Sequence, residues 1–325
     1  MSRFGGPGVK VRVREADETG VSETGKWPGA KTFAAPARRC GAWALRSPWL
    51  RSAGLVLAVG VSLWSFRRVP NVSWQPAVLG LVFWAAGKYL LCPLRWHALS
   101  ASGRRRRWHM LVYAEGELLG LASPGHVGAD LWRVRRLEVE AGLARSCAVA
   151  EVALDRLVGA FGLAVFVVAS GSTLPLRVLA AAGGIALSVL VVAVVVRRRR
   201  PGLLAGRPMP PPRIVVKGVL LSMGYQLSIV AVLTGALAAL DAHVSPLALV
   251  GVFGASQIAG IVPGVNGASP RDGALVVGLA AVGVPWGAAL GAVALIALLA
   301  WVPALLLGGS ALAVRRFMNR AVATA

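Results

Sequence analysis

The sequence predicts an all-α polytopic membrane protein, with about eight transmembrane helices and one short re-entrant or interfacial segment. The composition is 56% hydrophobic and only 15% charged, whereas soluble domains contain about 25% charged residues. A spanning helix needs roughly 20 apolar residues. Runs near this length lie at Leu50–Phe66, Gln75–Pro93, Ala148–Ala169, Leu176–Val196, Ile214–Leu240, Val244–Pro263 and Trp286–Gly308. Because backbone groups in lipid must bond to one another, such uninterrupted runs fit helices rather than barrel strands.

The net charge of +22 comes largely from basic residues between the apolar runs. A soluble protein this basic would suggest a nucleic-acid partner. Here the positive-inside rule accounts for the charge, so no nucleic-acid partner is expected. We predict a multi-pass protein of the cell membrane, with both termini and the loops at Arg104–Arg107 and Arg197–Arg200 in the cytoplasm.

Composition divides the chain into three predicted regions. Residues 1–45 are rich in Gly, Pro and charged residues, which predicts a disordered basic cytoplasmic tail rather than a signal peptide. Residues 46–310 form the predicted transmembrane domain, and residues 311–325 form a short cytoplasmic tail. Whether residues 1–45 are a genuine tail is left open.

The loop charges agree with cytoplasmic termini only if Met110–Ala122 does not cross the membrane. This segment is short and contains Glu115 and Glu117, and a charge within lipid costs roughly 2.5–3.5 kcal/mol. We therefore predict a re-entrant or interfacial helix at this position. Gly273–Val284 and the run that starts at Trp286 are predicted to form an outward and inward pair.

The first of three polar motifs is Ser123–Leu137, in which a Pro-Gly pair ends the short segment. Asp130 and Arg133 are three residues apart and share one helical face. They form either a structural ion pair at a helix start or part of a site for a headgroup or ion. His126 in the same turn is a further candidate.

The second motif is Ala150–Leu163. Glu151 and Asp155 lie four residues apart on one helical stripe, with Arg156 next to them. The arginine either extends to the membrane surface beside a local acid or contributes to a binding site.

The third motif is Val262–Leu275, where prolines and glycines interrupt an apolar region. Asp272 either caps the following helix, where an acid favours the helix dipole, or joins Arg271 in a site. Two short, interrupted segments, one in each half of a chain, are typical of a transporter-type binding site.

Lys88 lies inside the apolar run Gln75–Pro93, where an unpaired charge is costly. We expect its partner to be an acidic residue of one of the three motifs. The cysteines, Cys40, Cys92 and Cys147, show no metal-ligand spacing, and we predict no cofactor.

Together the motifs resemble the lysylphosphatidylglycerol synthase transmembrane-region family, also called flippase-like domain proteins. The family pattern P-G-x-x-G-G-D-x-x-R is matched by Pro124–Arg133, with Ala129 in place of a glycine. A Glu-Arg pair is matched by Asp155-Arg156, N-G-x-G-V-R-E by Asn266–Asp272, and an early L-x-W element by Leu94–Trp96. The order and spacing agree over roughly residues 48–310.

The resemblance implies that the chain handles membrane lipids, as a stand-alone member without the soluble synthase domain. In fused members such a region translocates an aminoacylated phospholipid, and some stand-alone relatives are tied to polyprenyl-linked glycans. The expected partners are lipids with an anionic or phosphate-bearing headgroup, and a lipid-modifying enzyme encoded separately. The expected substrate-binding residues are Lys88, His126, Asp130, Arg133, Asp155, Arg156, Asn266, Arg271 and Asp272.

Three functions are open at this stage. The first is a lipid translocase or lipid-binding protein for a polar-headgroup phospholipid or polyprenyl-linked lipid, with arginines that bind phosphate by forked hydrogen bonds. The second is a membrane-embedded transferase on a lipid carrier, in which the acids hold Mg²⁺ or act as bases. The third is a non-transporting partner of a glycosyltransferase or synthase. The sequence has no P-loop, HExxH or GxSxG motif, which favours a protein that is not an enzyme, and no catalytic residue is predicted.

Overall fold

The computed structural model describes residues 72–169 except 122, 124 and 125, residues 210–323 except 261–263, 265 and 268, and single positions elsewhere. Side chains beyond residue 317 are not described. The predicted tail at residues 1–45 and most of the predicted helices Leu50–Phe66 and Leu176–Val196 lie outside these residues. All described residues belong to the unit Ser47–Ala325.

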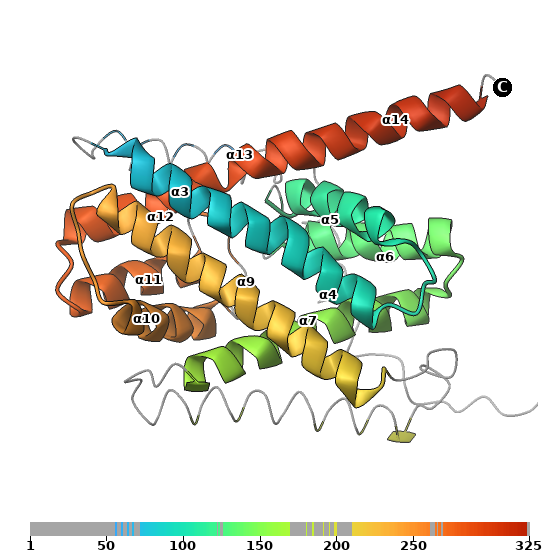
Figure 1. The fold of residues 1–325 in the computed structure, drawn as a ribbon, viewed down its shortest axis with the longest axis horizontal. Coiled ribbons are helices and arrows are strands. Elements are labelled where there is room, and N and C mark those ends of the chain that lie inside the picture. Colours follow the sequence, from blue (N-terminus) through green and yellow to red (C-terminus); the bar gives the residue numbers. More distant parts are fainter. Residues whose placement is uncertain are drawn as a thin grey trace, which may run out of the picture. The chain divides into compact units, whose positions relative to one another are not determined.

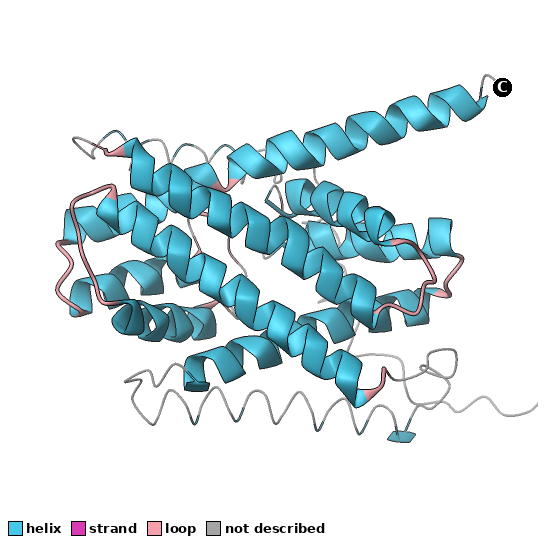
Figure 2. Ribbon diagram, viewed as in Figure 1, coloured by secondary structure: helices cyan, strands magenta, loops and turns pink. Residues whose placement is uncertain are grey.

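The described residues form helices and loops and contain no strand (Figure 2), which confirms the all-α fold. The helices shown in Figure 1 are α3 Trp74–Ala86, η1 Gly87–Leu91, α4 Cys92–Leu99, α5 Arg106–Leu121, α6 Val127–Ala141, α7 Arg145–Ala169, α9 Pro212–Ala238, α10 Pro246–Ala259, α11 Pro270–Ala281, α12 Trp286–Leu299, α13 Trp301–Pro303, η4 Ala304–Gly308 and α14 Gly309–Ala323. The η segments are π-helical turns within longer helices.

Among the described residues, 4 helices are long and apolar enough to cross a membrane. They are Trp74–Leu99, Arg145–Ala169, Pro212–Ala238 and Trp286–Phe317. The last continues beyond the predicted end of the transmembrane domain, because α14 extends the helix through most of the predicted C-terminal tail.

The predicted crossing at Val244–Pro263 is shorter than expected. Its helix, α10, has only 14 residues. Ser245 caps its start by accepting a hydrogen bond from the Ala248 backbone, and Gly260 follows its last residue. The helix in this apolar run therefore ends at Ala259. The neighbouring α11 is also short, with 12 residues, and packs against α10.

α5 occupies the segment that we predicted not to cross the membrane, and it packs against α6. It is 16 residues long and is not among the long apolar helices. Its two acids are buried and paired. Glu115 accepts hydrogen bonds from Trp132 of α6 and from Arg315 of α14, at 2.9 and 2.6 Å. The charges that disfavour a crossing therefore join α5 to α6 and to α14.

α3 and η1 pack along α9 through small residues (Figure 1). A methyl group added at Gly235 would lie 2.4 Å from the Pro76 carbonyl oxygen, and one at Gly87 would lie 2.1 Å from the Ser228 hydroxyl. In lipid, where water does not drive helices together, such close approach gives the helices their van der Waals contact. Gly235 is therefore required for this crossing.

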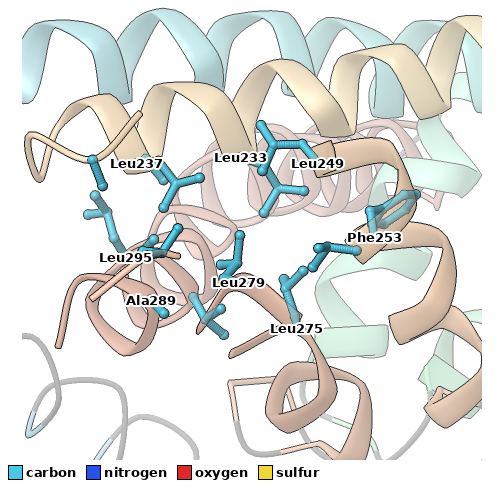
Figure 3. Close-up of a cluster of buried hydrophobic side chains, with 14 of the residues drawn as sticks. Leu233, Leu237, Leu249, Phe253, Leu275, Leu279, Ala289 and Leu295 are labelled. Atoms are coloured by element: carbon cyan, nitrogen blue, oxygen red, sulfur yellow. The ribbon is translucent and has the colours of Figure 1, made fainter. Parts of the chain in front are cut away.

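The largest cluster of buried apolar side chains joins α9, α10, α11 and α12. Figure 3 shows two of its residues from each helix, namely Leu233, Leu237, Leu249, Phe253, Leu275, Leu279, Ala289 and Leu295. The short helices α10 and α11 are thus held against two long ones. This packing places the loop between α10 and α11 at the site described next.

Candidate functional site

A cavity of about 260 Å³ lies between α5, with His126 just before α6, and the α10–α11 pair, and the long helices complete its wall. Each long helix lines the cavity with residues three or four positions apart, which lie on one face of the helix. On α9 these residues include Gln226, Ile229 and Leu233, and on α12 they include Val293 and Ile296. The polar lining comes from α5, the turn before α6 and the α10–α11 pair, from Tyr225 and Gln226 of α9, and from three charged positions on the other long helices, Lys88, Arg95 and Arg156.

The α3–η1–α4 helix contributes Trp84, Lys88, Cys92 and Arg95 to the cavity. Lys88 lies in the π-helical turn η1, where one extra residue shifts the helical register. Lys88 and Arg95 are seven residues apart, a spacing that places two residues on one helical face, and both line the cavity. π-Turns of this kind occur frequently at functional sites.

Cations outnumber acids in the cavity wall. Among the described lining residues the cations are Lys88, Arg95, Arg156 and Arg271, and the carboxylates are Glu117 and Asp272. Six of the nine predicted site residues line the cavity, namely Lys88, His126, Arg156, Asn266, Arg271 and Asp272. Asp130, Arg133 and Asp155 do not line it; they lie behind the wall.

Asp155 forms the centre of a buried ion-pair network. Its carboxylate accepts hydrogen bonds from Arg95 at 2.8 and 3.2 Å and from Arg133 at 2.7 Å. Arg95 also donates to the Ser222 hydroxyl at 3.0 Å, and the Arg133 guanidinium stacks over Trp96. Two cations share one carboxylate, so the network joins α4, α6, α7 and α9. The contacts of Asp155 therefore hold helices together and do not face the cavity.

Asp130 positions Arg156. The Arg156 guanidinium donates to the Asp130 carboxylate at 3.1 and 3.2 Å, and half of the Arg156 side chain is exposed. Asp130 also lies 3.7 Å from Arg133, as the three-residue spacing predicts. The partner of Arg156 is therefore an acid on α6 rather than the neighbouring acids of its own helix.

Lys88 pairs with an acid outside the three motifs, which corrects our prediction. Its ammonium lies 2.7 Å from the carboxylate of Glu117, on α5. Two of the three motifs are marked by glycine and proline breaks and the second by acids on one helical stripe, whereas Glu117 lies within the continuous helix α5. Both side chains are buried, so the ion pair ties η1 to α5.

Asp272 is a helix cap as well as a lining residue. Ser269 and Asp272 form a capping box at the start of α11, and the carboxylate also accepts a hydrogen bond from the Gly267 backbone at 3.0 Å. Asn266 donates to the Ala297 carbonyl of α12 at 3.0 Å. Arg271 touches Asp272 only at 3.4 Å, and 40% of its side chain is exposed. Asp272 thus holds Gly267 and Ser269, and Asn266 is held against α12. Arg271 has no comparable role in these contacts.

His126 lies at the turn before α6 in the left-handed region, at φ 57°. Its ring lies close to Gly120 of α5, where an added methyl group would meet Nδ1 at 2.8 Å. This glycine allows the histidine to reach the cavity wall.

Sequence analysis did not select Arg95, Glu117 or Gln226 as site residues. Arg95 is a charged residue at the end of an apolar run and belongs to the Leu94–Trp96 element, so its charge was a usable signal. Glu117 is likewise a charged residue in a largely apolar segment, so its charge also marked it as a candidate. Gln226 is neutral and lies in an apolar helix, where nothing local distinguishes it from a packing residue.

The described residues contain no group of three or more His, Cys, Asp or Glu side chains that could hold a metal ion. Their fold and cavity define an all-α, multi-pass membrane protein with a polar, cation-rich cavity. The family model for the lysylphosphatidylglycerol synthase TM region matches residues 51–308. The chain belongs to this family, which associates it with membrane lipids. The comparisons with curated proteins and with solved structures found no match.

Proposed function

We propose that the protein binds the phosphate-bearing headgroup of a membrane lipid in the cavity and translocates that lipid. The observation that carries the proposal is the surplus of cations in the wall. Arg156 and Arg271 are partly exposed there, and each has at least one guanidinium nitrogen that no acid in the described part of the chain contacts. Guanidinium groups bind phosphate oxygens through paired, charge-assisted hydrogen bonds.

The paired acids support an anionic rather than a cationic ligand. Glu117 is neutralised by Lys88, and Asp272 accepts hydrogen bonds from the loop that it caps. Behind the wall, Asp130 pairs with Arg156, and Asp155 is shared by Arg95 and Arg133. These pairs leave one positive charge without its own carboxylate, and an entering phosphate would offset it. Opposite charges inside a protein, where the effective dielectric constant is below that of water, attract more strongly than they would in bulk water.

The proposal is tested by binding and transport with the purified full-length protein. Native mass spectrometry would compare phosphatidylglycerol with phosphatidylcholine on the wild type and on Arg271→Gln. We expect the variant to bind phosphatidylglycerol at least tenfold more weakly. Arg145→Gln is the matched control, because Arg145 is 84% exposed and does not line the cavity.

Transport is measured in proteoliposomes with a fluorescent phosphatidylglycerol and an impermeant quencher. The wild type should expose the inner-leaflet lipid to the quencher, and Arg271→Gln should not. Equal binding by wild type and Arg271→Gln would contradict the headgroup site. Binding without transport would instead favour a lipid-binding protein. The transferase and partner hypotheses have no supporting observation among the described residues, and both stay predictions.

A further inference from the structure

We propose that Glu117 is a proton-binding site, which takes up a proton when a phosphate group of the ligand binds to Lys88. Proton uptake of this kind would couple the cavity to a pH difference across the membrane. The inference rests on the proposed function, because the phosphate is the group that replaces Glu117 as the partner of Lys88. It adds a second transported species, the proton, and an energy source for moving the lipid.

Glu117 has fewer partners than the other buried acids of the described residues. The buried acids there are Glu115, Glu117, Glu151, Asp155 and Asp272. All except Glu117 accept hydrogen bonds from two or more groups. Glu117 is held by a single contact, with the Lys88 ammonium 2.7 Å from its Oε2 atom, and no other described group donates a hydrogen bond to that oxygen. The charge of Glu117 therefore depends on one cation.

Lys88 lies where a phosphate can compete for it. It lines the same cavity as Arg156 and Arg271, which belong to the proposed phosphate site, and Glu117 lines this cavity as well. An ammonium group has three N–H donors, and Glu117 is the only ion-pair partner of Lys88 in the described part of the chain. A phosphate that binds to Lys88 would therefore leave Glu117 without a cation and place a second negative charge beside it.

This exchange changes the protonation of Glu117. Burial raises the pKa of its carboxyl group, but the Lys88 ammonium outweighs burial and holds this pKa at about 2. Once the phosphate takes the ammonium, burial and the phosphate charge both favour the neutral acid. A proton from the cavity then bonds to a carboxylate oxygen, and no other bond forms or breaks. The coupling is reciprocal, so protonation of Glu117 also strengthens phosphate binding.

Other titratable groups surround Glu117 and are candidates for the same proton. Arg156 of α7 keeps its charge because it is paired with Asp130. The uncharged groups are Tyr89 of η1, Cys92 of α4, Tyr113 of α5 and Tyr225 of α9, and η4 contributes none. Burial lowers the pKa of His126 to about 4, so this ring is neutral near pH 7 and is the main alternative acceptor.

Calorimetry measures the proton directly. The purified full-length protein is titrated at pH 6.5 with short-chain phosphatidylglycerol, whose phosphodiester does not titrate near this pH, in buffers of different ionisation enthalpy. We expect the wild type to take up about one proton per bound lipid, and its affinity to rise up to about tenfold for each unit by which the pH falls. Binding without proton uptake would overturn the inference.

Variants of the ion pair test the assignment to Glu117. Glu117→Gln cannot take up a proton, so it should bind phosphatidylglycerol without uptake and with the same affinity at pH 5.5 and pH 8. If this variant does not fold because Lys88 loses its partner, the double variant Lys88→Gln/Glu117→Gln removes both charges and should also show no uptake. Glu138→Gln is the matched control, because Glu138 does not line the cavity, and it should take up a proton like the wild type. Uptake that persists without Glu117 would overturn the assignment.

His126→Gln separates the two possible acceptors. It should keep the proton uptake per bound lipid, whatever its affinity for the lipid. Loss of uptake in this variant would place the proton on the histidine and overturn the assignment to Glu117.

Proteoliposomes with a pH difference test the energy source. Fluorescent phosphatidylglycerol should move towards the alkaline side at least threefold faster than towards the acidic side, because lipid and proton move together. A protonophore, which removes the pH difference, should abolish this asymmetry, and Glu117→Gln should lack it. Equal movement in both directions by the wild type would overturn proton coupling.

Failure of the proposed function gives a different result. Phosphatidylglycerol binding that does not respond to Arg271→Gln would overturn the phosphate site itself, whereas a response to Arg271→Gln without proton uptake would overturn only the present inference. Dimethyl phosphate is the soluble phosphodiester probe. If it binds as tightly as phosphatidylglycerol, the ligand is a free phosphodiester, and the lipid part of the proposal is wrong.

Discussion

At the scale of single residues, burial separates two aspartates that look equivalent in sequence. Asp155 has no exposed side-chain surface and holds Arg95 and Arg133, whereas the side chain of Asp130 is 32% exposed. Removing one partner of a buried ion pair leaves an uncompensated charge, which is far more costly than losing an exposed pair. The two carboxylates should therefore respond differently to neutralisation.

Asp155→Asn is expected to lower the free energy of unfolding by about 3–5 kcal/mol, because two buried arginines lose their only shared carboxylate. Asp130→Asn is expected to cost about 0–1 kcal/mol and to weaken lipid binding by releasing Arg156. Denaturant titration in detergent measures both. Similar losses of stability for the two variants would contradict the network described around Asp155.

His109, in the first turns of α5, makes stability depend on pH. Burial beside Trp96 and Trp108 lowers its pKa to about 4, from a usual value near 6.5. The unfolded chain therefore takes up a proton near pH 6.5, whereas the folded protein does not. The stabilisation by this group is complete above pH 6.5 and is lost as the pH falls towards 4.

We expect the wild type to lose up to about 1.4 kcal/mol per pH unit from this residue between pH 6.5 and 4. His109→Gln lacks the titrating group, so its stability should fall less steeply over the same range. Parallel denaturant titrations at pH 8, 6 and 5 measure the difference. Identical pH slopes for the two proteins would show that His109 protonates as readily when folded.

At the scale of helices, glycines determine how closely the long helices approach. Gly235 of α9 faces the α3 backbone, and an added methyl group would lie 3.2 Å from the Gly80 Cα. Neither backbone can move without displacing a helix that also lines the cavity. Gly287 at the start of α12 has no atom within 4 Å of the corresponding position.

Gly235→Ala should therefore destabilise the protein by about 1–3 kcal/mol, the usual cost of overpacking. Gly287→Ala is the matched control and should be neutral or slightly stabilising, because alanine is the better helix former. Thermal unfolding in detergent compares them. If Gly235→Ala is as stable as the control, α3 and α9 do not depend on this close contact.

At the scale of the whole molecule, two pairs of short helices, α5–α6 and α10–α11, meet at one cavity. A described residue between the helices of each pair lines the wall, His126 before α6 and Asn266 before α11. Such interrupted helices are tolerated in membranes where they border a cavity. Residues of all three motifs that carry the family resemblance, His126, Arg156 and Asn266, therefore line the same cavity.

The sequence by itself determined that the chain is helical and embedded in membrane, that α5 is too short and charged for an ordinary span, and which motifs surround the cavity. These are local properties, because helix length, apolar composition and the cost of charge can be read along the chain. Only the tertiary structure decided which charges pair and which face the cavity. Arg95 meets Asp155 across 60 positions, and Lys88 meets Glu117. Gln226 faces the cavity because helices distant in sequence pack beside it.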